Sequence, residues 1–135
     1  MDPTLATVLG VFMRWVHIIS VVILIGGLFY ARGIGTTISP WFRPKIWIGL
    51  GGILVSGTYN LLTKSSVPPM YHMWFGIKML LALHIFAVLV LLANKNSNPA
   101  KHGRWITGVL VSGTVVITLS AYLRWLTLSP VVKLP

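Results

Sequence analysis

The sequence predicts an all-α integral membrane protein, a single domain over residues 1–135 built as a four-helix bundle. Of the 135 residues, 56% are hydrophobic and only 9% are charged, whereas a soluble domain carries about 25% charged residues. Apolar stretches fall at residues 9–30, 46–63, 73–93 and 105–128. Each approaches or exceeds the ~17–25 residues that span a hydrocarbon core. Because these stretches are apolar around the whole helical circumference, they fit lipid rather than the surface of a soluble bundle.

The first apolar stretch is expected to stay in the protein as a helix. Only Arg14 precedes its long apolar part, Asp2 lies near its start, and no A-x-A cleavage site follows. These features differ from those of a cleaved signal peptide. The sequence contains no cysteine, which excludes disulfides and thiolate metal sites.

The basic residues predict how the helices are oriented in the membrane. The formal net charge is +10, and the cations lie mostly near helix ends rather than on one soluble face, so nucleic-acid binding is not expected. The connections after the first and third helices carry six cations: Arg32, Arg43, Lys45, Lys95, Lys101 and Arg104. The opposite side has Lys64 and Lys133. The positive-inside rule then predicts cytoplasmic basic loops, extracytoplasmic termini and a bacterial inner (plasma) membrane location.

A five-residue motif occurs twice. Leu-Val-Ser-Gly-Thr stands at residues 54–58 and again at 110–114, each time after a basic residue and a Trp-Ile pair. This pattern indicates a tandem repeat of a two-helix unit, or else chance and shared packing requirements; both interpretations stay open. In a tandem repeat, the first and third helices would be equivalent and would run in the same direction.

Five ionisable side chains fall inside the apolar stretches: Arg14, His17, Lys78, His84 and Arg124. Such residues are costly in a bilayer and by default mark a ligand, ion path or cofactor. Counting from the start of each stretch places His17 ~12 Å deep and His84 ~16 Å deep, which is one layer of the membrane. The three cations lie nearer the outer surface. We therefore expect His17 and His84 to be metal ligands and the three cations to bind an anionic part of the same cofactor.

The scarcity of acids restricts the chemistry. Asp2 is the only acidic side chain, so a glycosidase carboxylate pair and a Ser-His-Asp triad are excluded. Haem ligation, copper ligation and binding of an anionic lipid or quinone remain. The nearby cations would repel a copper ion but would bind haem propionates. This favours a b-type haem.

Simpler roles exist for the same residues. A single Arg or Lys near a helix end can extend to the lipid headgroups, and a histidine can hydrogen-bond across helices through Ser20, Thr58, Thr114 or another hydroxyl. We expect His72 and His102 to be surface residues. The tryptophans all fall near predicted membrane boundaries and suit an aromatic belt: Trp15, Trp41, Trp47, Trp74, Trp105 and Trp125.

Two segments of the first helix resemble a known family. The stretches RWVHIIS at 14–20 and GGLFYAR at 26–32 look like the first helix of the HemJ-type protoporphyrinogen oxidases and the related CopD-like copper-resistance membrane proteins. Trp74, Lys78 and His84 resemble a later helix of the HemJ type. The resemblance implies a compact helical membrane fold, with His17 as a haem ligand and Lys78 as a functional cation.

The function expected is that of a haem b membrane protein. It would pass electrons between a quinone or redox protein and an acceptor, or act as a membrane oxidoreductase of the HemJ kind; no catalytic residue is assigned. Three alternatives stay open. They are a non-redox subunit or transporter-like protein that binds an anionic lipid or partner, CopD-like copper handling, and a pigment-binding subunit. A homo-oligomer and a subunit of a larger membrane complex both stay open.

Overall fold

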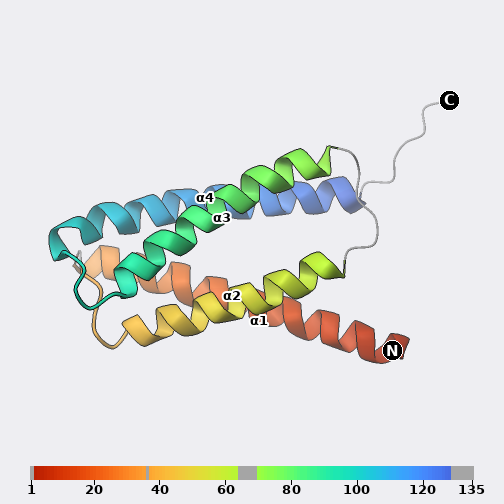
Figure 1. The fold of residues 1–135 in the computed structure, drawn as a ribbon, viewed down its shortest axis with the longest axis horizontal. Coiled ribbons are helices and arrows are strands. Elements are labelled where there is room, and N and C mark those ends of the chain that lie inside the picture. Colours follow the sequence, from red (N-terminus) through yellow and green to blue (C-terminus); the bar gives the residue numbers. More distant parts are fainter. Residues whose placement is uncertain (1, 36, 64–69, 129–135) are drawn as a thin grey trace.

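The computed structural model is a bundle of four helices and describes residues 2–35, 37–63 and 70–128. The helices are α1 (Pro3–Ile34), α2 (Arg43–Leu62), α3 (Tyr71–Ala93) and α4 (Pro99–Leu128). The helices α1 and α2 form one hairpin and α3 and α4 the other, and the hairpins meet through α2 against α3 and α1 against α4 (Figure 1). The described residues contain no strand. The prediction of an all-α four-helix fold is confirmed.

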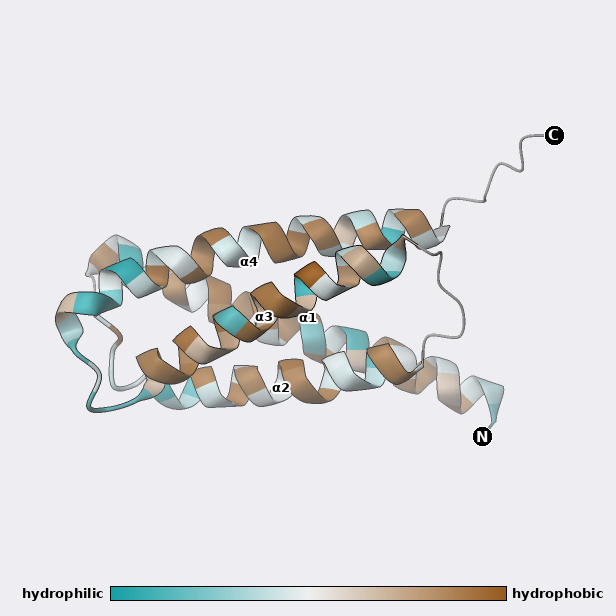
Figure 2. Ribbon diagram, turned by 45° about the horizontal axis from the view of Figure 1, so that its top comes forward, coloured by the Kyte–Doolittle hydropathy of each residue, from teal (hydrophilic) through white to brown (hydrophobic). Residues whose placement is uncertain are grey.

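Three of the helices in the described part of the chain, α1, α3 and α4, are long and apolar enough to cross a membrane. The 20-residue helix α2 is not among them and packs along α1. Hydrophobic residues occur on all sides of the helices. Hydrophilic residues are concentrated at the end of the bundle that carries the α1–α2 and α3–α4 connections (Figure 2). We call this the basic end and the opposite one, where α1 begins and α4 ends, the terminal end. Lys64 and Lys133, expected on the opposite side of the membrane, lie outside the described residues.

Capping residues set helix boundaries that the apolar stretches did not predict. The carboxylate of Asp2 accepts a hydrogen bond from the Thr4 amide at 2.9 Å, and Pro3 occupies the first helical position. At α4 the Asn98 side chain accepts from the Ala100 amide at 3.0 Å. Because an Asx cap followed by proline is a strong helix start, α1 and α4 begin before the hydrophobic runs at 9–30 and 105–128.

The hydrophobic core lies mainly at the basic end. Its buried cluster joins all four helices and the α1–α2 connection, and consists of Leu24, Leu28, Ile38, Phe42, Ile46, Leu50, Leu89, Leu92, Ala93, Ile106 and Val109. Toward the terminal end the two hairpins diverge (Figures 1 and 2). The half of the bundle that carries Arg14, His17 and Lys78 is therefore less densely packed than the half that carries the basic loops.

Small residues on α2 allow α1 to approach closely. A Cβ atom added at Gly49 would lie 2.7 Å from Leu24 Cγ, and one added at Gly52 would meet Ser20. Close contact of this kind stabilises helix pairs in lipid, where no hydrophobic force drives them together. These glycines therefore serve the packing of α1 against α2.

We predict that Gly49→Ala destabilises the protein while Gly51→Ala does not. The new methyl group at Gly49 must displace the buried Leu24, which costs about 1–3 kcal/mol in an overpacked core. A methyl group at Gly51 would meet no atom within 4 Å, and alanine is the better helix former. Thermal unfolding in detergent, followed by circular dichroism, measures both changes. Equal melting temperatures for the two variants would contradict the packing described here.

Candidate functional site

His17 is the ionisable residue that faces a neighbouring helix inside the terminal half. It lies one turn before Ser20 on the face of α1 that continues through the buried Leu24 and Leu28. Its Nδ1 atom is 2.9 Å from the hydroxyl of Ser56 on α2. The imidazole also passes over Gly57, where an added Cβ would lie 3.8 Å from His17 Cε1. His17 is thus held against α2.

The hydrogen bonds of Ser56 determine which nitrogen of His17 carries the proton. The Ser56 hydroxyl donates to the Gly52 carbonyl one turn earlier. A serine hydroxyl has a single hydrogen, so in the contact with His17 the hydroxyl oxygen accepts and the imidazole Nδ1–H donates. The neutral ring then keeps an unprotonated Nε2. A histidine that ligates a metal is commonly fixed in this way by a hydrogen bond from its other nitrogen.

Lys78 on α3 belongs to the same half of the bundle. Its side chain is half-buried and lies on the face of α3 that continues to Ile85, which packs against the hydrophobic core. The helices α1 and α3 are not neighbours in the bundle, so His17 and Lys78 do not share a helix interface. The structure places these two of the five predicted site residues in the same half of the bundle, each with a partly buried side chain.

Trp74 adds a hydrogen-bond donor to this half of the bundle, a role that neither the aromatic belt nor the family resemblance predicted. It lies one turn before Lys78 on α3, and its ring packs edge-on against Tyr122 of α4 with centroids 5.7 Å apart. The indole Nε1 is buried and has no hydrogen-bond partner among the described residues. Buried donors are nearly always paired, so this N–H marks a place where an acceptor would fit. The aromatic-belt assignment alone gave no sign of it.

The other three predicted site residues have exposed side chains: Arg14, His84 and Arg124. His84 lies on an outer stripe of α3 with the exposed Ile77 and Leu80, about 100° from the inward-facing Ile85 because neighbouring residues of an α-helix are rotated by that angle. The structure therefore does not bring His84 next to His17. The exposure of Arg14 and Arg124 near the terminal end is consistent with side chains that extend to headgroups.

The two hairpins differ in their polar contacts even though both carry the repeated motif. Ser56 in the first copy is buried and bonded to His17. Its counterpart Ser112 is half-buried, and the described part of the chain shows no bond between it and His84. The glycine of the motif also packs differently in the two copies, because Gly57 lies beside α1 of its own hairpin and Gly113 lies against Ile25 of α1 in the other hairpin. Duplication of a two-helix unit stays a prediction.

His102 corrects another expectation. It was predicted to be a surface residue, and this is wrong, since its side chain is only 1% exposed. Its Nδ1 accepts from the Ile38 amide at 3.4 Å, and its Nε2 is 2.8 Å from the Ser97 hydroxyl. His102 thereby joins the α1–α2 connection to the α3–α4 connection. His72 is exposed, as expected.

A multi-ligand metal centre built from protein side chains is not found in residues 2–35, 37–63 and 70–128. No three His, Cys, Asp or Glu side chains gather there.

Comparison with known proteins gives no match: no family model, no curated protein and no solved structure matches the chain. The resemblance to the HemJ-type and CopD-like proteins therefore stays a prediction.

We predict that Ser56→Ala destabilises the protein more than Ser112→Ala. The first change removes the acceptor for His17 Nδ1–H and leaves a buried donor unpaired, at a cost of about 1 kcal/mol. The second removes the matching hydroxyl of the repeated motif, which has no such role. Thermal unfolding in detergent compares the two variants, and ¹⁵N NMR of labelled histidine reports the tautomer of His17. A His17 ring protonated at Nε2 in the unmodified protein would contradict the assignment.

We also predict that His102→Ala lowers stability by about 2–3 kcal/mol, because it removes two buried hydrogen bonds and opens a cavity. The matched change His72→Ala should stay within about 0.5 kcal/mol, as is usual for surface positions. Chemical unfolding in detergent measures both. Equal effects of the two substitutions would show that His102 does not join the loops.

Proposed function

We propose that the protein binds a b-type haem in the terminal half of the bundle, with His17 as an axial iron ligand. The observation that carries the proposal is the hydrogen bond from His17 to Ser56. It orients the ring and leaves Nε2, the nitrogen that ligates haem iron, without a proton. Gly57 has no side chain beside the His17 ring, so the imidazole can lie close to the α2 backbone while Nε2 stays available to a ligand.

The neighbours of His17 fit the anionic edge of such a cofactor. Lys78 supplies a positive charge on the inner side, and the Trp74 N–H supplies a donor that needs an acceptor. Carboxylates form their strongest hydrogen bonds with cationic and N–H donors of this kind. In this proposal Lys78 and Trp74 hold one propionate, while Arg14 and Arg124 hold the other near the headgroups.

The role of His84 decides which haem chemistry follows. Among the described residues His17 is the one histidine near the interior of the terminal half. A haem held by His17 alone would be able to bind a small molecule, which would suit an oxidoreductase. Ligation by both histidines would need α3 to turn by about 100° and would suit electron transfer with a quinone or a redox protein. We favour the first arrangement because it uses the structure as it stands.

Haem is also favoured over a bare copper ion. Imidazoles bind copper well, but the described residues gather no set of three ligands, and the half-buried Lys78 adds a positive charge to the same half of the bundle. A haem brings its own four nitrogen ligands and two carboxylates. It therefore needs only one or two protein ligands and benefits from the same positive charge that would repel copper.

An absorption spectrum of the full-length protein, expressed with adequate haem supply and purified in detergent, tests this function. We expect a Soret band that His17→Ala abolishes and that added imidazole restores, because free imidazole can replace the missing ligand. His72→Ala, on the exposed surface of α3, is the control and should keep the band. His84→Ala should keep it too.

Other outcomes are equally informative. Loss of the band in both His17→Ala and His84→Ala would replace the single-ligand arrangement by a two-histidine haem. A colourless protein that is folded by circular dichroism would refute haem binding altogether. The non-redox alternative would then be preferred.

A further inference from the structure

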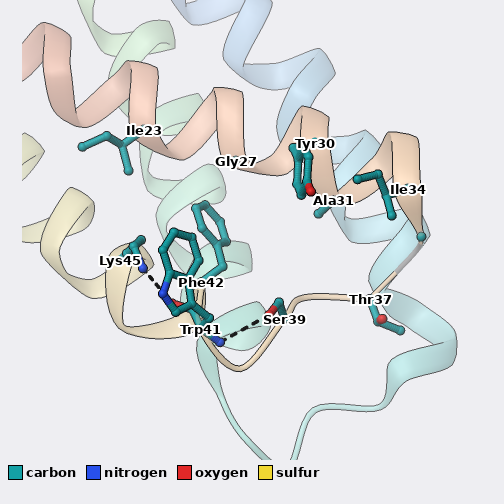
Figure 3. Close-up of a pocket in the computed structure, with 11 residues that line it drawn as sticks. Ile23, Gly27, Tyr30, Ala31, Ile34, Thr37, Ser39, Trp41, Phe42 and Lys45 are labelled. Atoms are coloured by element: carbon teal, nitrogen blue, oxygen red, sulfur yellow. Dashed lines mark hydrogen bonds between the residues drawn. The ribbon is translucent and has the colours of Figure 1, made fainter.

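A cavity of about 820 Å³ lies at the basic end, away from the proposed haem site. It is open on one side and is lined by the second half of α1, the α1–α2 connection and the first turn of α2 (Figure 3). Its volume is in the range of pockets that bind small organic ligands. Nothing in the proposed haem function uses this cavity.

The cavity is apolar along the helix and polar at the connection. Ile23, Ala31 and Ile34 of α1 form its apolar side, and the hydroxyl-bearing Thr37 and Ser39 lie on its rim. Ile23 and Ile34 are separated by eleven positions, which corresponds to ~16 Å along a helix axis. A ligand that fills this space must therefore be amphiphilic and long.

Lys45 gives the polar rim a positive charge. Its ammonium group donates a hydrogen bond to the Trp41 carbonyl at 3.0 Å and lies 2.8 Å from the centre of the Trp41 ring. Lysine has three N–H donors, so this ammonium can still bind an acceptor. Lys45 is the one charged residue that lines the described cavity, and the sequence has a single acidic side chain against eleven basic ones.

We propose that this cavity binds an anionic phospholipid of the surrounding membrane. The lipid phosphate is held by Lys45 and the hydroxyl of Ser39, which both hydrogen-bond to Trp41, and an acyl chain lies along the apolar side of the cavity. The long apolar side of the cavity favours a lipid over a free anion. The positive charge of Lys45, which meets no carboxylate among the described residues, favours an anionic lipid over a zwitterionic one. Tyr30 and Trp41, at the rim, suit the interface between headgroups and acyl chains.

Native mass spectrometry of the full-length protein in detergent tests the charge requirement. Phosphatidylglycerol and phosphatidylcholine with identical acyl chains are titrated in parallel. One lysine near the membrane surface is worth about fivefold in the binding of an anionic lipid, so phosphatidylglycerol should bind about fivefold more tightly than phosphatidylcholine. Lys45→Gln should remove this preference, whereas Lys95→Gln, which changes an exposed lysine of the other basic connection, should keep it.

A second pair of variants tests the cavity itself. Gly35 lines the cavity in an extended backbone conformation with φ of −170° that any residue adopts, and an added Cβ meets no atom within 4 Å. Gly35→Leu should therefore fill the space without disturbing the fold and should abolish the tight phosphatidylglycerol site. Gly33→Leu is the matched control, since Gly33 is equally unobstructed but does not line the cavity.

Each contrary result would overturn the lipid site. Equal binding of the two lipids would refute the charge requirement, and equal losses in Lys45→Gln and Lys95→Gln would show a diffuse surface attraction. Unchanged binding in Gly35→Leu would place the lipid elsewhere. Displacement of phosphatidylglycerol by an equal concentration of inorganic phosphate would show a free-anion site. The haem spectrum is independent of all four results.

Discussion

The close contact between α1 and α2 is the constraint on which the candidate haem site depends. Helices in lipid gain nothing from hiding apolar surface from one another, so van der Waals packing and interhelical hydrogen bonds must hold them. Gly49 and Gly52 permit the approach, and on the same face the Ser56 hydroxyl comes within bonding distance of His17. One row of small residues thus joins the helices and fixes the imidazole.

The hydrophobic core is concentrated in one half of the bundle, at the basic end. At the basic end, aliphatic side chains from all four helices form one core, and buried His102 ties the two connections together. At the terminal end the hairpins diverge (Figure 1), and the inward-facing groups include Lys78 and Trp74. A closed end of this kind can keep the helices assembled while the other end accommodates a cofactor.

Hydropathy was sufficient to predict the number and approximate position of the helices, but not which way each helix faces. On α3 both the inner and outer stripes are apolar, so no amphipathic pattern separates Lys78, which faces inward, from His84, which faces outward. The sequence showed only that these two residues lie on different sides of the helix. His102 was misplaced for a related reason, because a polar residue beside a loop is usually exposed and only the fold of both connections buries it.

The imbalance of charge connects the two proposed sites. With Asp2 as the sole acidic side chain, engaged at the start of α1, the chain has almost no carboxylates to neutralise its cations. Arg14, Arg124 and Lys45 lie where lipid headgroups can supply negative charge. The charge of Lys78 lies on the inner face of α3, where its side chain is half-buried and a headgroup reaches less easily. An anionic ligand bound between the helices would compensate this charge, and haem propionates, as proposed, are carboxylates attached to a group that His17 can hold.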